Sequence, residues 1–207
     1  MSASKDSIFE LIEQIKKKAP EYLDLLTAKT DEEFETAFDA VLDKAVRHLE
    51  KNSKNFKKLN EVGLSGALAG SLSIPGLTVT QEAHSNGHVD LIIEADHCIP
   101  NRTKLAEAKI YGGPEYHISG MSQLLDRYST GSEGRGLLIS FVRQQDIKSL
   151  IANLRKKMDK ELPLQQTKPT QNHKLKWSFL SMHTHSSGEE LELGHVGCNL
   201  FSNKTKK

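Results

Sequence analysis

Three charged residues lie inside two apolar stretches of the sequence. Asp90 lies within residues 88–94 (HVDLIIE), and Glu107 and Lys109 lie within residues 105–111 (LAEAKIY). Side chains of a strand alternate between its two faces, so Glu107 and Lys109 are expected to point to the same side. Burying two carboxylates and an ammonium is costly unless these groups pair with one another or hold a metal ion.

Two carboxylates that converge suit a divalent cation, because the cation removes their mutual repulsion. Asp90, Glu107 and the backbone carbonyl of Ala108 could hold Mg²⁺ or Mn²⁺, bound through oxygen together with several waters. Such an ion would polarise a phosphodiester and lower the pKa of an attacking water. Lys109 would orient or deprotonate that water, or stabilise charge that builds on phosphorus. The alternative is a structural ion pair of these acids with Lys109 or Lys104.

Hydrophobic periodicity predicts the elements that carry these residues. We expect helices over residues 7–18, 30–49 and 56–72, from His117 or Ser119 to Tyr128, and over 146–158. We expect strands over residues 77–83, 89–95, 105–111, 136–142 and 174–182, and a last hairpin through 190–201. The predicted order along the chain is helices, three strands, a helix, a strand, a helix and further strands. This order predicts an α/β fold with a mixed sheet and helices packed on it.

The helix that starts after Thr30 is strongly marked, because Thr30 and Glu33 have the spacing of a capping box. Its apolar stripe must be buried against the rest of the chain or against a partner subunit. The stripe consists of Phe34, Ala37, Phe38, Val41, Leu42, Ala45, Val46 and Leu49.

The composition of the 207-residue chain limits the classes of function. A net charge of +1 argues against a globally basic nucleic-acid binder, although a local basic groove remains compatible with it. The two cysteines form neither a Cys-x-x-Cys site nor a disulfide framework, and the N-terminus has no apolar signal core, so we expect a cytoplasmic protein. Residues 62–81 carry no charge, but Pro75 and several glycines argue against a membrane span.

The combination of Asp90 with Glu107-Ala108-Lys109 on the next strand, followed by a helix and a strand, resembles the PD-(D/E)XK nuclease superfamily. In that superfamily an acidic residue on the preceding helix often completes the metal site, and Glu61 is in the matching place. Many members also carry a glutamine on the helix after the Glu-x-Lys strand, and Gln123 matches it.

The resemblance covers residues 56–142 and has two departures. Val89 stands where a proline is usual before the aspartate. Arg127 stands where the RecB-like branch has a tyrosine, and Tyr128 follows one position later, which leaves the branch open. The resemblance implies a restriction-endonuclease-like core over residues 55–201, preceded by an N-terminal helical annex (1–54), closed by a C-terminal β-hairpin and followed by a basic tail (202–207).

Several basic residues are candidates for contact with a phosphate backbone: Arg127, His88, His117, Lys57 and Lys58. For each of the two histidines, a solvated or core role is the commoner alternative, and for the lysines a solvated charged face is. A separate set near the C-terminus, His183, His185, His195 and Cys198, could supply four zinc ligands, although its spacing matches no standard zinc pattern.

The resemblance therefore implies a Mg²⁺- or Mn²⁺-dependent endonuclease that cleaves DNA rather than RNA, in restriction or defence against phage. A homodimer or a partner-protein complex is expected, with the stripe of residues 34–49 as one possible interface. One alternative is a catalytically silent module of the same fold that binds nucleic acid or scaffolds a complex. Another is a protein-interaction domain dominated by its N-terminal helices. Metal binding through Asp90 and Glu107 distinguishes the nuclease from a scaffold.

Overall fold

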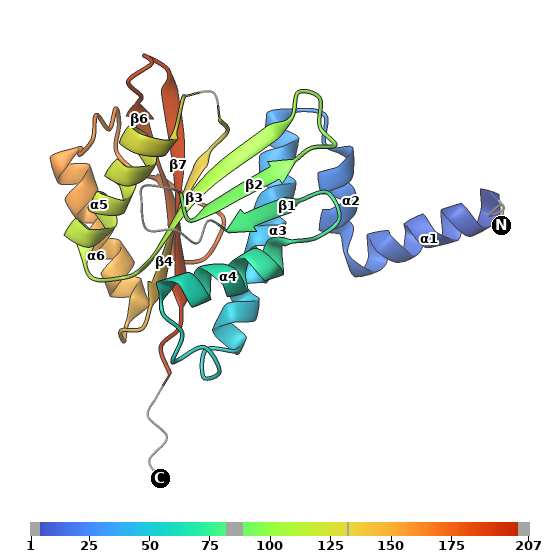
Figure 1. Ribbon diagram of the computed structural model, residues 1–207, viewed down its shortest axis with the longest axis horizontal. Coiled ribbons are helices and arrows are strands. Elements are labelled where there is room, and N and C mark those ends of the chain that lie inside the picture. The colour runs from blue at the N-terminus through green and yellow to red at the C-terminus, as the bar shows by residue number, and fades with distance from the viewer. Residues whose placement is uncertain (1–4, 82–88, 132, 203–207) are drawn as a thin grey trace, which may run out of the picture.

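The computed structural model describes residues 5–81, 89–131 and 133–202, and Figure 1 shows their arrangement. Four helices come first: α1 (Lys5–Lys18), α2 (Pro20–Thr27), α3 (Asp31–Lys51) and α4 (Glu61–Leu72). They are followed by β1 (Thr78–Gln81), β2 (Leu91–Ala95), β3 (Arg102–Ile110), α5 (Pro114–Gln123) and a π-helical turn, η1 (Leu124–Tyr128). The chain closes with β4 (Gly136–Val142), α6 (Ile147–Glu161), β5 (Gln171–Asn172), β6 (Ser178–Thr184) and β7 (Glu190–Asn199). This order confirms an α/β fold.

Within the described residues the strands form one mixed sheet of seven, in the order β1-β2-β3-β4-β7-β6-β5. The pairs β1–β2 and β2–β3 are antiparallel, whereas β3–β4 and β4–β7 are parallel. The far edge is antiparallel again, through β7–β6 and β6–β5. Every residue of β4 is buried, as expected for a central strand covered on both faces.

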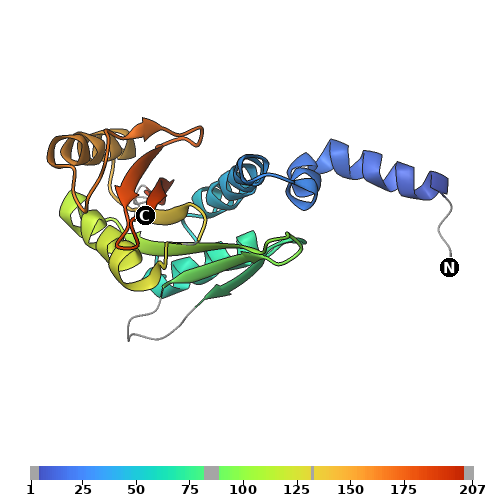
Figure 2. The same ribbon diagram turned by 90° about the horizontal axis from the view of Figure 1, so that it is seen from above.

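Helices cover both faces of the sheet, as the two views in Figures 1 and 2 show. On one face, α3 and α4 pack over even-numbered residues of β3, including Ala106 and Ala108. On the other face, α5 and α6 pack over odd-numbered residues, including Leu105 and Tyr111. The alternation of strand side chains therefore places Glu107 and Lys109 on the α5 face.

Helix α3 confirms the predicted cap and explains the apolar stripe. The Thr30 hydroxyl accepts from the Glu33 amide at 3.2 Å, and the Glu33 carboxylate accepts from the Thr30 amide at 3.3 Å. All eight stripe residues are buried in the core beneath α3. The stripe therefore packs on the sheet, which leaves it unable to form the predicted dimer interface. The predicted boundary between residues 54 and 55 falls between α3 and α4, which share this core.

Helix α1 projects from the body of the molecule, and its neighbour in the fold is α2 (Figures 1 and 2). Ile8, Phe9 and Leu11 on this helix are exposed. Over the described ranges, no helix is long and apolar enough to cross a membrane.

The helix predicted over residues 56–72 begins later, at Glu61. Asn60 caps it by accepting from the Gly63 amide at 2.9 Å. The preceding residues form turns instead, because the Arg143 guanidinium donates to the carbonyls of Phe56 and Leu59 and holds them against the end of β4. These carbonyls are therefore satisfied without a helix.

Three other expectations differ in detail from the structure. The helix predicted to start at His117 or Ser119 starts at Pro114, and its last turn is π-helical. The predicted C-terminal hairpin is the pair β6–β7, and β7 lies inside the sheet, parallel to β4. The strand predicted over 77–83 runs over Thr78–Gln81, and its remaining residues lie outside the described part of the chain.

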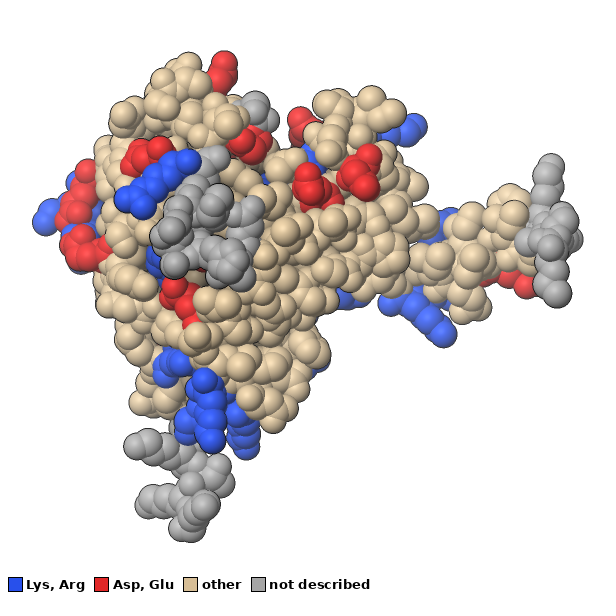
Figure 3. Space-filling model, in the orientation of Figure 1, with Lys and Arg blue, Asp and Glu red and all other residues tan. Residues whose placement is uncertain are grey.

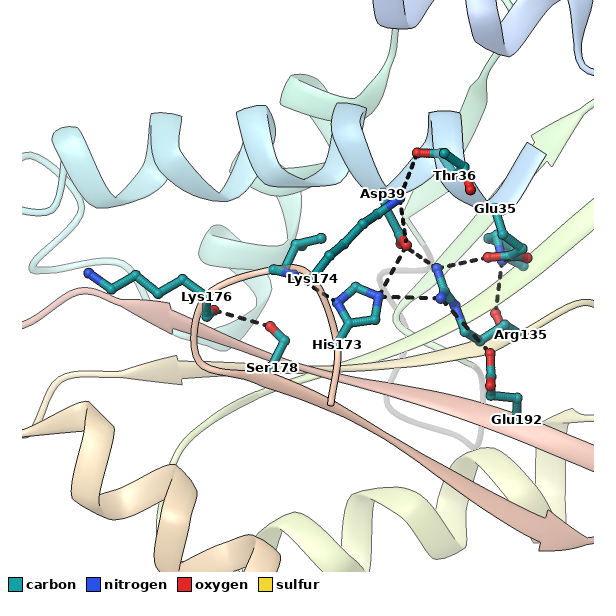
Figure 4. A network of polar contacts seen from close by, with 11 residues as sticks. Glu35, Thr36, Asp39, Arg135, His173, Lys174, Lys176, Ser178 and Glu192 are labelled. Atoms are coloured by element: carbon teal, nitrogen blue, oxygen red, sulfur yellow. Dashed lines mark hydrogen bonds and ion pairs between the residues drawn. The ribbon is translucent and has the colours of Figure 1, made fainter. Parts of the chain in front are cut away.

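A buried charged network fastens α3 to the sheet (Figure 4). The Arg135 guanidinium, at the start of β4, pairs with Asp39 and with Glu35 (2.8 Å). His173 lies 3.1 Å from the second oxygen of Asp39, and Lys174 lies 3.5 Å from it. Burial alone would raise the pKa of Asp39, but His173 and Arg135 hold it below the ordinary value. The network therefore contributes stability only while Asp39 is ionised.

Replacing Arg135 with methionine should lower the free energy of unfolding by about 3–5 kcal/mol, because the substitution removes the guanidinium that Asp39 and Glu35 share. Urea denaturation at neutral pH measures this loss. Asp39 has a lowered folded-state pKa, so its contribution is present above its ordinary pKa and lost as pH falls through the folded value. The difference between wild type and Arg135→Met should therefore shrink in acid.

Arg47→Ala is the matched control. Arg47 also pairs with an aspartate of α3, Asp43 at 2.6 Å, but its side chain is exposed, so the cost should be about 0–1 kcal/mol. Equal losses for the two variants would contradict a structural role of the buried network.

Candidate functional site

The candidate site forms where the β2–β3 ladder ends. The last paired residues are Leu91 and Ala106, so the next amides on that edge of β3 face no strand. The Ala108 amide donates to the Asp90 carboxylate at 2.8 Å, and the Ile110 amide donates to the Glu61 carboxylate at 2.8 Å. Two acids from different elements, the start of β2 and the first turn of α4, are thereby drawn to one strand edge.

Glu107 and Lys109 lie on the α5 face of the same part of β3. The Lys109 ammonium lies 2.7 Å from one Glu107 oxygen, and both side chains are largely buried. Gly120 of α5 makes room for Lys109, since a Cβ built at Gly120 would lie 3.1 Å from the lysine Cε. The ammonium also lies 5.7 Å from the centre of the Tyr116 ring, a cation–π contact.

The electrostatics show that these four charged groups act on one another. Burial raises the pKa of Asp90, and burial together with the charges of Asp90 and Glu61 raises the pKa of Glu107. Burial alone would lower the pKa of Lys109, but Glu107, Glu61 and Asp90 hold it above the ordinary value. Lys109 is therefore an ammonium at neutral pH, surrounded by three carboxylates.

The oxygen donors fit a magnesium ion bound with several waters. The second oxygen of Glu107 is buried and has no hydrogen-bond partner. The Ala108 carbonyl points to the same edge of β3 as its amide, and hence toward Asp90. Over the described ranges, no three His, Cys, Asp or Glu side chains group closely enough to hold a metal by themselves. Proteins nevertheless usually bind Mg²⁺ through only one or two carboxylates, and waters complete its coordination. A carbonyl oxygen would be a further ligand of the same kind.

The two residues predicted on the helix after β3 differ in burial. Gln123 ends α5, and its side-chain oxygen is buried without a hydrogen-bond partner. Arg127 lies in the π-helical turn η1 and is exposed. Gln123 and Arg127 are four residues apart, about one helical turn, so the predicted shared face is compatible with the π-helical turn.

His117 does not present a nitrogen to nucleic acid. It is buried, and its ring nitrogens lie 2.9 Å from the Ser140 hydroxyl and 2.7 Å from His195. This corrects the expected phosphate contact, because both nitrogens are already engaged in the interior. The other histidine of that prediction, His88, lies outside the described residues.

The four possible zinc ligands do not converge. His195 is buried on the α5 face of the sheet, whereas Cys198 lies in the core beneath α3 and α4. His185 bonds instead to Ser187 and to the carbonyl of Ser129. Burial raises the pKa of the Cys198 thiol, and this thiol lies on the opposite face of the sheet from His195.

Lys57 and Lys58 are exposed on the loop between α3 and α4, three or four residues before Glu61. Lys51 and Lys54 on the same stretch are exposed as well. Blue side chains gather at the lower end of the face shown in Figure 3, where this loop lies in Figure 1. The site thus has a basic flank next to its acidic centre.

A hollow in the described structure lies elsewhere, between α2, α3 and residues 173–176. It measures about 1220 Å³ and contains none of the predicted site residues. Its inner wall includes Asp39 and His173, whose polar atoms already bond within the charged network. This hollow is therefore separate from the candidate site.

Sequence reasoning missed two parts of the site. The signal for Gly120 was a glycine inside an otherwise helical segment, which often marks close packing. The amides of Ala108 and Ile110, which bind the acids, have no signal in the sequence, because the end of the β2 ladder leaves them free.

Asp90→Asn should stabilise the protein in the absence of metal. The folded-state pKa of Asp90 lies above its ordinary value, so ionisation weakens the fold as pH rises through the folded pKa. A neutral amide can still accept from the Ala108 amide and removes the cost of the charge. In EDTA at neutral pH we expect unfolding free energy to rise by about 0.5–2 kcal/mol, as active-site replacements often do.

Adding magnesium should stabilise the wild type and leave Asp90→Asn unchanged, because the variant lacks one anionic ligand. Thermal melting at several magnesium concentrations measures both effects. This assignment of Asp90 would be contradicted if Asp90→Asn had a lower melting temperature than the wild type in EDTA. It would also be contradicted if magnesium raised the melting temperature of both proteins equally.

Comparison of the sequence with protein-family models and with curated proteins found no match, and no solved structure matched either. The assignment of the site therefore rests on its own geometry. Its defining features are two acids on free amides of β3, a Glu107 oxygen without a partner, and an ammonium held among three carboxylates.

Proposed function

We propose that the chain is a metal-dependent nuclease that hydrolyses phosphodiester bonds, with a restriction-endonuclease-like core and Mg²⁺ or Mn²⁺ as its cofactor. The observation that carries this proposal is the buried Glu107 oxygen without a partner, in a carboxylate on which the charge of Asp90 acts. A buried carboxylate oxygen without a partner is costly in a structural ion pair and useful in a metal site. The succession of α4, three strands with Glu-x-Lys on the third, α5 and β4 supports the same fold.

Asp90, Glu107 and the Ala108 carbonyl would hold the ion, and Glu61, whose charge acts on Glu107 and Lys109, would add to the negative potential there. Bound there, the ion supplies Lewis acidity toward the phosphodiester and activates water. Asp90 and Glu61 remain oriented by the Ala108 and Ile110 amides, which fix their positions before the substrate arrives.

Lys109 stabilises charge in this proposal and does not act as a base. Its pKa is raised by the neighbouring carboxylates, so it carries its proton at the pH of the reaction. An ammonium in this place balances the negative charge that develops on the phosphoryl oxygens. Gln123, whose side-chain oxygen has no partner, can accept a hydrogen bond from a water or from the substrate.

DNA is the proposed substrate in preference to RNA, on the resemblance noted above, and restriction or defence against phage is the setting that it suggests. The exposed lysines 51, 54, 57 and 58 offer contacts to phosphates without reading bases. A homodimer or a partner protein would supply target choice.

The second candidate is a catalytically silent nucleic-acid-binding or scaffolding module of the same fold. It is favoured by the protein partners that Asp90, Glu61 and one oxygen of Glu107 already have. A silent module would bind nucleic acid without cleaving it, so cleavage and metal binding separate the two candidates.

Cleavage of supercoiled plasmid, single-stranded DNA and RNA, each with magnesium, manganese or EDTA, tests the proposal. We expect metal-dependent cutting of DNA that EDTA abolishes. Asp90→Asn and Lys109→Met should each lower the rate at saturating metal by about 10²–10³-fold or more, as loss of one transition-state contact does.

Glu94→Gln is the control, because Glu94 is another partly buried acid of β2, outside the site. Cutting at the wild-type rate in both site variants would rule out this site. Absent cutting combined with magnesium binding that Asp90→Asn abolishes would identify a dormant nuclease. Absent cutting without magnesium binding would favour the scaffold.

Replacing both Lys57 and Lys58 with alanine should weaken DNA binding by a similar factor for all sequences. Each lost phosphate contact should reduce the slope of log affinity against log salt by about 0.9 for double-stranded DNA. Fluorescence anisotropy across salt concentrations, in calcium or EDTA to prevent cutting, measures the slope. The exposed pair Lys156 and Lys160 on α6 provides the matched double variant, whose slope should remain that of the wild type.

A further inference from the structure

A chain of buried polar side chains crosses the α5 face of the sheet. It begins at Ser140 of β4, whose hydroxyl lies 2.9 Å from His117 Nδ1 on α5. His117 Nε2 lies 2.7 Å from His195 Nδ1 on β7. The ring of His195 is held in its plane by Phe179, stacked at 4.3 Å with an interplanar angle of 5°.

The same series of hydrogen-bonded side chains continues onto β6 without a break. His195 Nε2 lies 2.7 Å from the Ser181 hydroxyl, which lies 2.8 Å from His183 Nε2. His183 Nδ1 lies 2.9 Å from the backbone carbonyl of Leu164, where the chain ends. The side chains of all five residues are buried.

Burial keeps the three histidines neutral. It lowers the pKa of His117 to about 4, holds the pKa of His195 well below its ordinary value and lowers the pKa of His183. Each neutral ring therefore has one nitrogen that donates and one that accepts.

Only one arrangement of protons then satisfies every contact. A carbonyl can only accept, so His183 donates to Leu164 from Nδ1 and its Nε2 must accept from the Ser181 hydroxyl. The Ser181 hydroxyl donates its proton to His183, so its oxygen must accept from His195 Nε2. His195 Nδ1 is then an acceptor.

The remaining two contacts follow in the same way. His117 donates from Nε2 to His195 and accepts at Nδ1 from the Ser140 hydroxyl. All five hydrogen bonds therefore run in one direction, from Ser140 to Leu164. One backbone carbonyl determines the tautomers of three histidines on three different elements.

The first member of the chain lies beside the candidate site. Ser140 is the residue of β4 that pairs with Lys109 of β3, and paired residues of neighbouring strands face the same side. His117 lies one turn before Gly120, against which Lys109 packs, and two turns before Gln123. The bond between His117 and Ser140 thus anchors α5 over the sheet at the level of Lys109.

We propose that His117 is a positioning residue for this site, oriented by the one-directional chain so that α5 holds Gly120 against Lys109. The inference rests on the proposed function and deepens it, because the ammonium of Lys109 is the group that α5 places. Apolar packing alone accepts alternative arrangements more readily than a satisfied polar network does. A shift of α5 would instead leave His117 and Ser140 buried without partners, which opposes the movement.

The proton arrangement is tested by nitrogen-15 NMR of the histidine rings at pH 7, without metal or DNA. We expect the proton on Nε2 in His117 and His195 and on Nδ1 in His183. Any other tautomer, or a charged ring at pH 7, overturns the chain. This measurement is independent of cleavage, so its failure is distinct from failure of the proposed nuclease.

The positioning role is tested by the nuclear Overhauser effect between the Lys109 Hε and Gly120 Hα protons. We expect this signal in the wild type, its loss in His117→Ala and Ser140→Ala, and its retention in His185→Ala. His185 is the matched control, because it is a buried histidine outside the chain. Ser140→Ala removes one donor with little change in volume, so it decides the test if His117→Ala does not fold.

Retention of the signal in both chain variants overturns the positioning role. In cleavage assays at saturating magnesium, kcat should fall about 10–100-fold in both variants, with the KM for DNA unchanged. Residues that orient the groups of a metal site without touching the substrate have effects of this size. A fall in kcat of the same size in His185→Ala would show a general loss of packing and would also overturn the proposal.

Discussion

The candidate site depends on the unpaired edge of β3 beyond Ala106. Backbone amides in the interior need a partner where strand pairing ends. Here β2 begins at Leu91, opposite Ala106 of β3, whereas β3 continues past Ala106 to Ile110. The amides of Ala108 and Ile110 are satisfied by Asp90 and Glu61. A backbone requirement therefore brings together two carboxylates that would otherwise repel each other, and it does so beside Glu107 and Lys109.

Polar contacts hold the helices in place on both faces of the sheet. Beneath α3, Arg135 joins Asp39 and Glu35, and on the opposite face His117 joins α5 to β4 and β7. Apolar packing brings helices and sheet together but tolerates small shifts, whereas a satisfied polar network accepts few alternatives. Both networks meet β4, through Arg135 just before the strand and Ser140 within it, so the central strand locates both helix layers.

The sequence predicted those parts of the structure that local pattern controls. Strand β4 has the predicted bounds, the Thr30 capping box is present, and Glu107 and Lys109 share a face because strand side chains alternate. The histidine chain could not be predicted, because His117 and His195 are 78 residues apart and meet only through the order of strands. For the same reason the sequence could not decide between a phosphate contact and a core role for His117, which the structure places in the core beside β4 and β7.

The proposal of a bound cation rests on the charge balance of the site. Asp90, Glu107 and Glu61 bring three carboxylates to Lys109, so two negative charges remain when all are ionised. A purely structural cluster would be expected to match its charges, because each unmatched buried carboxylate weakens the fold. The raised pKa values of Asp90 and Glu107 express that cost. In the function proposed above, one divalent cation would balance the two charges and give the Glu107 oxygen a partner, which would offset the cost of the arrangement.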